Sequence, residues 1–323
     1  MKITVEKREK VHLIRLENQA GLSLSLCSFG ASIHEISLDG KKVNRVEEDF
    51  AAFLSSPAYY GKTVGPLAGR IQNACFEGRS LEANEGQTCL HGGPKGYSFT
   101  DFDYAIEEKE DRTNVIFRHS FQDNVGLGGS LSFQVIYVLF EKRSEFRIVF
   151  KGLSNQDTYL NPTNHSYFNL DDLTVEKHLL SVHSKKHIRY DKDLLPLEFV
   201  SNEGPHDFSK AKEIGKDIRD PLLYQTKENG YDAYYLFEKG VGPQVVLSYR
   251  GLSLEITTDM SGAQIYSSNY PEESRLLNDG EKDRLYAGLA IEPMDNPLDH
   301  EGLLLKANLP YSRYIGYHFK RTK

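Results

Sequence analysis

Tryptophan is absent from this chain of 323 residues, although the chain carries 19 tyrosines and 17 phenylalanines. Cysteine is scarce: Cys27, Cys75 and Cys89 are an odd number and form no C-x-x-C pair. Neither a disulfide framework nor a zinc ribbon is therefore expected. The cysteine content predicts a protein of the reducing cytoplasm.

Long apolar runs and concentrated positive charge are also missing. No stretch approaches the roughly 20 apolar residues that a membrane-spanning helix needs, and the opening MKITVEKREK lacks the apolar core of a secretion signal. The formal net charge is −7, and lysine and arginine are spread along the chain. We therefore expect neither a membrane nor a nucleic acid as a partner.

The sequence is rich in alternating apolar and polar residues, which is typical of strands with one buried face. LSFQVIYVLF (131–140) and EFRIVFK (145–151) both show this period of two. QVVLSYRGLSLEITT (244–258) alternates on both sides of Arg250-Gly251, which predicts a tight hairpin.

Helical patterns are few and short. NRVEEDFAAFLSS (44–56) predicts about three turns that Pro57 ends, and the region 191–230 is predicted to form loops and short helical turns. Alternating β-α-β units are absent, so a parallel sheet is not expected. We predict an all-β fold, a large antiparallel β-sandwich with few short helices, in one domain over residues 1–323.

Two patterns imitate ligand sites. Gly61-Lys62-Thr63 resembles the end of a phosphate-binding loop, but Ser56 stands where the first glycine of that loop belongs. HSKKH (183–187) has a histidine spacing that suits a metal on a helix. Its surroundings predict a strand instead, along which the two histidines lie about 13 Å apart, and we interpret them as surface histidines.

Two stretches contain the residues best suited to proton transfer. In LNPTNHSYFNL (160–170), hydrogen-bonding side chains around His165 can fix the local turn and hold the imidazole at one angle, as a general acid requires. An ordinary capped loop is the alternative. In LAIEP (289–293), Glu292 ends an apolar run, so burial is expected to raise its pKa and make it a usable base.

Three further stretches contain candidate ligand-binding residues. Arg70 follows a glycine in GPLAGRI, and its guanidinium can donate two hydrogen bonds to neighbouring oxygens. His91 precedes two glycines in CLHGG, and Asp232 lies between tyrosines in GYDAYYLF, as carboxylates in sugar sites often do. The ordinary interpretations are a surface ion pair, a solvated loop and a strand-start aspartate, respectively.

Together these stretches, in this order along nearly the whole chain, resemble the aldose 1-epimerase (galactose mutarotase) family. The resemblance implies a β-sandwich of galactose-mutarotase type, an aldohexose substrate, and neither cofactor nor metal. It makes His165 the general acid and Glu292 the general base. It also implies that sugar hydroxyls are bound by Arg70, His91 and Asp232, with Gln264 in SGAQIYSSN as a further substrate contact.

The chain departs from the family pattern at two points. Many members have G-R-x-A-N-R where this chain has Gly65-Pro66-Leu67-Ala68-Gly69-Arg70, and many have a tryptophan beyond the LHGGPKG stretch. These departures leave the preferred aldose open. The implied activity is interconversion of the α and β anomers of free hexoses such as galactose and glucose. The alternatives are an epimerase of a phosphorylated or modified hexose, a non-catalytic sugar-binding or regulatory protein, and a polysaccharide lyase or hydrolase.

Overall fold

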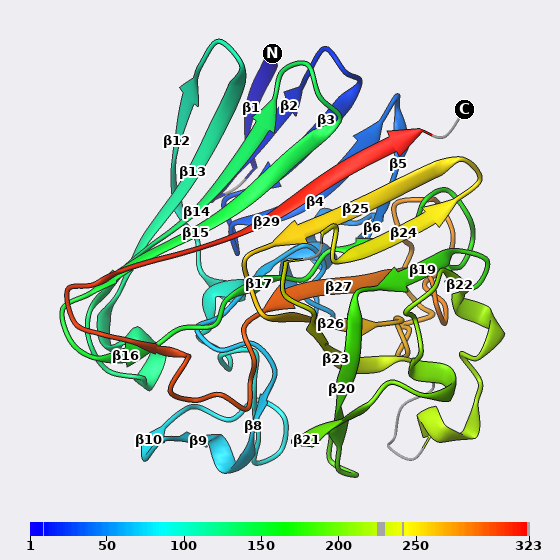
Figure 1. The fold of residues 1–323 in the computed structure, drawn as a ribbon. Coiled ribbons are helices and arrows are strands. Elements are labelled where there is room, and N and C mark those ends of the chain that lie inside the picture. The colour runs from blue at the N-terminus through cyan, green and yellow to red at the C-terminus, as the bar shows by residue number, and fades with distance from the viewer. Residues whose placement is uncertain (9, 225–229, 241, 322–323) are drawn as a thin grey trace.

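The computed structural model describes residues 1–8, 10–224, 230–240 and 242–321, and strands dominate it (Figure 1). The largest sheet has nine strands, in the order β12 (Asp103–Glu108), β13 (Arg112–Phe121), β14 (Leu131–Phe140), β15 (Glu145–Ser154), β29 (Pro310–Arg321), β25 (Leu252–Thr258), β24 (Val245–Tyr249), β19 (Leu179–Val182) and β22 (Lys212–Glu213). The strand predictions at 131–140 and 145–151 and the hairpin within 244–258 are confirmed.

Two further sheets complete the framework. The five-stranded sheet runs β1 (Lys2–Arg8), β2 (Val11–Glu17), β3 (Leu22–Cys27), β4 (Ser32–Leu38) and β5 (Lys41–Lys42). The seven-stranded sheet runs β21 (Pro196–Ser201), β20 (Ser184–Tyr190), β23 (Asp232–Phe237), β26 (Gly262–Tyr266), β27 (Leu289–Met294), β18 (Tyr167–Phe168) and β6 (Asn44–Arg45).

Short pairs of strands form separate two-stranded sheets. They are β7 (Thr63–Val64) with β17 (Thr163–Asn164), β8 (Arg70–Ile71) with β11 (Cys89–Leu90), β9 (Cys75–Phe76) with β10 (Arg79–Ser80), and β16 (Thr158–Tyr159) with β28 (Leu304–Leu305). The 3-10 turns are η1 (Gln72–Ala74), η2 (Tyr97–Phe99), η3 (Gln122–Gly126), η4 (Gly204–His206), η5 (Ile214–Lys216) and η6 (Pro221–Tyr224).

One hydrophobic core joins the three large sheets. Leu24 of the five-stranded sheet, Phe133 of the nine-stranded sheet and Ile291 of the seven-stranded sheet belong to the same buried cluster. In Figure 1, β13, β14, β15, β29 and β25 run across the upper part of the view, and β20, β23, β26 and β27 lie below them. Antiparallel sheets that share a buried face in this way form a β-sandwich, as predicted.

The helix prediction for residues 44–56 is only partly correct. Helix α1 covers Phe50–Ser55 and begins after Asp49, whose carboxylate accepts a hydrogen bond from the backbone N–H of Ala52. Residues Asn44–Arg45 instead form β6 and pair with Tyr167–Phe168. Pairing with a distant strand therefore overrides the local helical preference here.

The region 191–230 forms β21, β22 and the three short turns η4 to η6, while residues 225–229 lie outside the described part. The HSKKH stretch is a strand from Ser184 onward, but the interpretation of surface histidines is wrong for His187. That residue is buried, and its ring stacks on His206 with centroids 3.8 Å apart. None of the helices in the described ranges is long and apolar enough to cross a membrane.

Candidate functional site

A cavity of about 900 Å³ opens on one face of the seven-stranded sheet, and all six predicted site residues line it. The sheet register explains part of this convergence. Gln264 on β26 lies opposite Glu292 on β27, and Asp232 on β23 lies opposite Tyr266. Since Gln264 and Tyr266 are two residues apart, their side chains point to the same face, and so do those of their partners.

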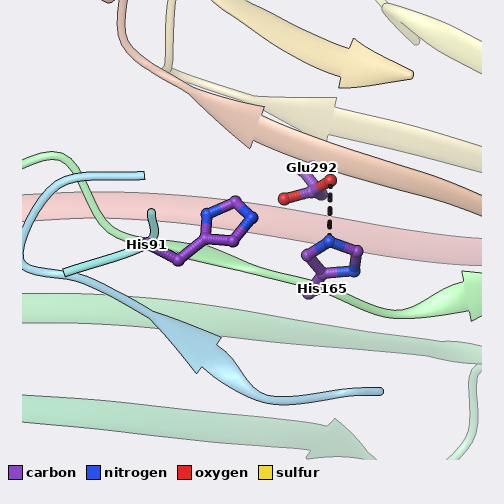
Figure 2. A group of neighbouring side chains, drawn as sticks. All are labelled: His91, His165 and Glu292. Atoms are coloured by element: carbon purple, nitrogen blue, oxygen red, sulfur yellow. Dashed lines mark ion pairs between the residues drawn. The ribbon is translucent and has the colours of Figure 1, made fainter. Parts of the chain in front are cut away.

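The imidazole of His165 and the carboxylate of Glu292 meet at the floor of this cavity. His165 Nε2 lies 3.3 Å from Glu292 Oε1 (Figure 2). Both residues are almost fully buried, with 5% and 2% of their surface exposed. His165 Nδ1 and Glu292 Oε2 have no hydrogen-bond partner among the described residues. Buried polar atoms without a hydrogen-bond partner cost stability, so the fold does not gain from these two groups as they stand.

The backbone of His165 is held by the segment before β7. Its N–H donates to Lys62 O at 2.9 Å, and its carbonyl accepts from Gly61 N at 2.9 Å. Asn164 Nδ2 also donates to Gly61 O, at 2.8 Å. The predicted fixation by neighbouring polar side chains is thus present. However, these bonds reach distant segments rather than closing a local turn as expected.

Burial shifts the two proton-transfer candidates in opposite directions. It raises the pKa of Glu292 well above the ordinary glutamate value, and the charge of Asp232 adds to this. Burial lowers the pKa of His165 to about 4. The desolvated cavity disfavours the charged form of each group.

His91 lies on the other side of His165, with ring centroids 5.5 Å apart. The N–H of Gly69 donates to His91 Nδ1 at 3.2 Å, so the neutral ring carries its proton on Nε2. The turn that exposes this ring requires Gly92, because a Cβ there would lie 2.1 Å from Gly65 O. His91 is therefore presented as a hydrogen-bond donor.

Arg70 forms the ion pair that was its ordinary interpretation. Its Nε and Nη2 bind the Glu85 carboxylate at 2.7 and 3.2 Å, which is the expected ion pair at the rim, and the side chain also lines the cavity. A bidentate partner fixes the guanidinium plane, so its orientation toward the cavity is set in advance.

Asp232 begins β23, as predicted, and is connected to Gln264 and Tyr190. Gln264 Nε2 donates to Asp232 Oδ1, and the Tyr190 hydroxyl donates to Gln264 Oε1 at 2.9 Å. This chain of hydrogen bonds orients a carboxylate and an amide at the same wall of the cavity. Such groups can accept and donate hydrogen bonds to several hydroxyls at once.

The geometry also permits a test of metal binding. His91, His165 and Glu292 each offer a ligand atom, and these atoms lie within 4.8 Å of one another. A histidine that binds a metal usually donates its other ring N–H to an acceptor. His91 instead accepts a bond from Gly69 at Nδ1, and its remaining nitrogen is protonated. This tautomer suits a sugar hydroxyl and opposes a metal ion.

Sequence reasoning missed the aromatic rings around His165. The ring of Tyr167 is 4.9 Å from that of His165, and the rings of Tyr59 and Tyr266 lie at 6.1 and 6.4 Å. All three line the cavity. The available signals were the Tyr-Tyr-Gly run at 59–61 for Tyr59, and the positions of Tyr167 and Tyr266 close to the predicted site residues His165 and Gln264.

Comparisons with known proteins identify the family of this chain. The sequence pattern of the aldose 1-epimerase family matches residues 12–306. The maltose epimerase of Levilactobacillus brevis is 29% identical over 95% of this chain and 94% of its own length. The aldose 1-epimerase of Haemophilus influenzae is 30% identical over 95% of each chain.

A similar fold occurs in the crystal structure of galactose 1-epimerase from Lactobacillus acidophilus. It superimposes with a TM-score of 0.89 at 23% identity, covering 100% of this chain and 99% of the other. The family pattern covers most of the sequence, and the fold is shared over the full length. The chain therefore belongs to the aldose 1-epimerase family of isomerases.

Proposed function

We propose that this protein interconverts the α and β anomers of free hexoses such as galactose and glucose, with His165 and Glu292 as the proton-transfer residues. The supporting observation is the 3.3 Å separation of His165 Nε2 and Glu292 Oε1 in the cavity. The ring oxygen and the anomeric hydroxyl are bonded to the same carbon. An acid and a base that serve both must therefore lie side by side.

Ring opening requires two proton transfers. In the reactive form of the pair, Glu292 is ionised and His165 is protonated. Glu292 accepts the proton of the anomeric hydroxyl, and His165 donates its proton to the ring oxygen while the bond between that oxygen and the anomeric carbon breaks. The products are an aldehyde and a free hydroxyl. At this point Glu292 is protonated and His165 is neutral, which is the arrangement that burial favours for each group.

Ring closure reverses the same transfers. The aldehyde rotates about its bond to the next carbon, and the hydroxyl attacks its other face. His165 then takes back the proton of that hydroxyl, and Glu292 returns its proton to the anomeric oxygen. The pair holds one proton before and after the cycle, so the reaction consumes no cofactor and no net acid or base.

The surrounding residues are proposed to bind the sugar. Arg70 and His91 offer N–H donors from one side, while Asp232 and Gln264 offer an acceptor and an amide from the other. Tyr59, Tyr167 and Tyr266 cover the C–H faces of the ring. We propose further that residues 1–323 act as one domain in the cytoplasm, without a metal, a nucleic acid or a membrane.

A reducing disaccharide is the second candidate substrate. The relative from Levilactobacillus brevis is named a maltose epimerase, and a cavity of about 900 Å³ is large for one hexose. Ligand cavities generally measure about 300–1,000 Å³, and a monosaccharide is among the smaller ligands.

The test is polarimetry of freshly dissolved sugars. The panel contains α-galactose, α-glucose, xylose, maltose and a hexose phosphate, each with and without the protein. We expect galactose and glucose to reach anomeric equilibrium much faster with the protein present. A sugar-binding protein would bind them without changing that rate, and this result would refute the proposed activity.

A further inference from the structure

The cavity continues past the proton-transfer pair into an arm that the proposed chemistry does not use. We call this the acidic arm. It is lined by Glu47, Tyr60, Glu272, Arg275 and Asp283, which belong to the same continuous cavity as His165 and Glu292. Glu47 follows β6 at the edge of the seven-stranded sheet, and the other acidic residues come from the loop between β26 and β27.

Glu47 is a buried carboxylate with half of its hydrogen-bonding capacity unused. Only 2% of its surface is exposed. Its Oε1 accepts from the Ser56 hydroxyl at 3.1 Å and from Arg275, whereas Oε2 has no hydrogen-bond partner within the described ranges. A buried carboxylate oxygen without a donor is costly. Because Glu47 lines the cavity, a ligand with hydroxyl groups can supply that donor.

Asp283 and Tyr60 also line the arm. The Tyr60 hydroxyl hydrogen-bonds to the Asp283 carboxylate, which also accepts the backbone N–H groups of Glu272 and Arg284, each at 2.9 Å. Both Tyr60 and Asp283 are at least nine-tenths buried.

A floor of aromatic rings connects the arm to the proton-transfer pair. The ring of Tyr167 lies 4.9 Å from that of His165 and 4.7 Å from that of Tyr60. Aromatic floors flanked by carboxylates suit sugars, since the rings cover C–H faces and the carboxylates accept hydroxyl protons.

The sheet register gives the distance from the reaction centre. Strand β27, which carries Glu292, is followed in the sheet by β18 and then by β6. Neighbouring strands lie about 4.8 Å apart, so the arm begins about 10 Å from Glu292. A hydroxymethyl group extends only two bonds of about 1.5 Å each beyond a pyranose ring. It cannot reach Glu47, but a second sugar ring can.

The proposed roles of the pair orient the first ring. Glu292 serves the anomeric hydroxyl, and His165, just before β18, serves the ring oxygen. The ring oxygen therefore lies nearer to the arm, and so does carbon five with its exocyclic carbon six. Carbons two and three lie on the opposite edge of the ring, and carbon four, next to carbon five, lies across from the anomeric carbon. A substituent that enters the acidic arm is thus attached through carbon six.

We infer that the acidic arm is a subsite for a second, uncharged sugar ring attached to carbon six of the reducing hexose. This inference rests on the proposed anomer exchange. Three carboxyl groups and one guanidinium line the arm. This charge balance opposes a phosphate at carbon six and accepts a neutral ring with several hydroxyls.

The test compares glucose, isomaltose (two glucose units joined through carbon six), maltose and glucose 6-phosphate as substrates for anomer exchange. The variants are Glu47→Gln and the matched control Glu48→Gln, a neighbouring exposed residue outside the cavity. Glutamine preserves the acceptor for Ser56 and Arg275 but replaces the unpaired oxygen with an NH₂ group. Asp283→Asn is the second variant if Glu47→Gln does not fold, as judged by thermal unfolding.

We expect wild-type kcat/KM for isomaltose to equal or exceed that for glucose, and that for glucose 6-phosphate to be lower. Glu47→Gln should lower kcat/KM for isomaltose about tenfold to hundredfold, with glucose changed less than about twofold and Glu48→Gln without effect. Exchange of glucose and maltose but not isomaltose would overturn the subsite and leave the proposed function standing. If neither Glu47→Gln nor Asp283→Asn changes kcat/KM for isomaltose, the subsite is likewise overturned and the proposed function stands. Failure with glucose here, together with failure of galactose in the polarimetric panel described above, would overturn the proposed function itself.

Discussion

Strands β14 and β27 of this protein bury different kinds of side chain. In β14, apolar residues alternate with partly exposed ones from Leu131 to Leu139, and the buried face belongs to the common core. In β27, all six residues from Leu289 to Met294 are buried, and one of them is the carboxylate of Glu292. Strand β14 buries apolar side chains, whereas β27 buries a carboxylate as well.

This difference separates the part of the molecule that stabilises the fold from the part that lowers its stability. Burial of apolar surface stabilises the fold by about 25 cal/mol per Å². Burial of an ionisable group costs stability unless it is paired. The β27 region and its neighbours bury Glu292, His165 and Glu47 with incomplete hydrogen bonding, so the surrounding core must hold them in place.

The sharpest way to test this contrast is Glu292→Gln. Loss of the proposed base is expected to lower kcat/KM for galactose by about 10²- to 10⁴-fold. The raised pKa of Glu292 stabilises the fold only below the ordinary glutamate value of about 4.3, and this contribution is lost as the pH rises. At neutral pH the glutamine variant should therefore be at least as stable as the wild type.

Polarimetry and thermal unfolding measure the two effects on the same samples, with Glu48→Gln as the control. A folded Glu292→Gln protein with wild-type activity would show that Glu292 takes no part in the mechanism. A large loss of stability would show instead that the carboxylate serves the fold.

The complementary change is Phe133→Ala in β14. Phe133 is fully buried in the core and lines no part of the cavity. The cavity left behind should cost about 3–5 kcal/mol in the free energy of unfolding, measured by denaturant titration. The kcat of the folded fraction should remain within about twofold of the wild type. A kcat that falls in proportion to stability would mean that the two regions are not separable.

Buried histidines predict a decline in stability on the acid side. Burial lowers the pKa values of His34, His165 and His178 to about 4 each. In the unfolded chain these histidines bind protons near pH 6.5, whereas in the folded protein they do so only near pH 4. The free energy of unfolding therefore keeps its maximum contribution from these groups above pH 6.5 and falls as the pH drops from 6.5 to 4. The free energy of unfolding falls by up to roughly 3 kcal/mol per histidine.

Melting temperatures measured between pH 7.5 and 4.5 test this decline. The His178→Gln variant removes one of the three groups at a position outside the cavity, and it should flatten the curve. An unchanged pH profile in that variant would show that His178 does not contribute.

The smallest expected effect is that of Glu85→Gln at the cavity rim. The carboxylate is 46% exposed in its ion pair with Arg70, and such pairs contribute about 0–1 kcal/mol. We expect KM for galactose to rise less than about fivefold, with kcat unchanged, by steady-state polarimetry. A loss as large as that of Glu292→Gln would place Arg70 among the groups that act in the transition state rather than in binding.

The sequence allowed the regular ladders to be predicted because period-two alternation has one physical cause, a sheet with one buried face. It did not reveal that Asn44–Arg45 pairs with Tyr167–Phe168, since pairing of distant segments leaves no local periodicity. The same limit explains why Glu47, in a stretch interpreted as helix, was not recognised as lining the cavity. His165 and Glu292 were identified by their unusual neighbours, but their 3.3 Å approach required the fold.

Strand β29 lies in the middle of the nine-stranded sheet, between β15 and β25, although it comes last in sequence among the strands of the described residues. A ribosome producing this chain must release residues 310–321 before the two halves of that sheet can be joined. Enzymatic activity should therefore switch on late and abruptly during synthesis. Truncation before β29 should yield an inactive polypeptide with open, aggregation-prone strand edges rather than a weakened enzyme.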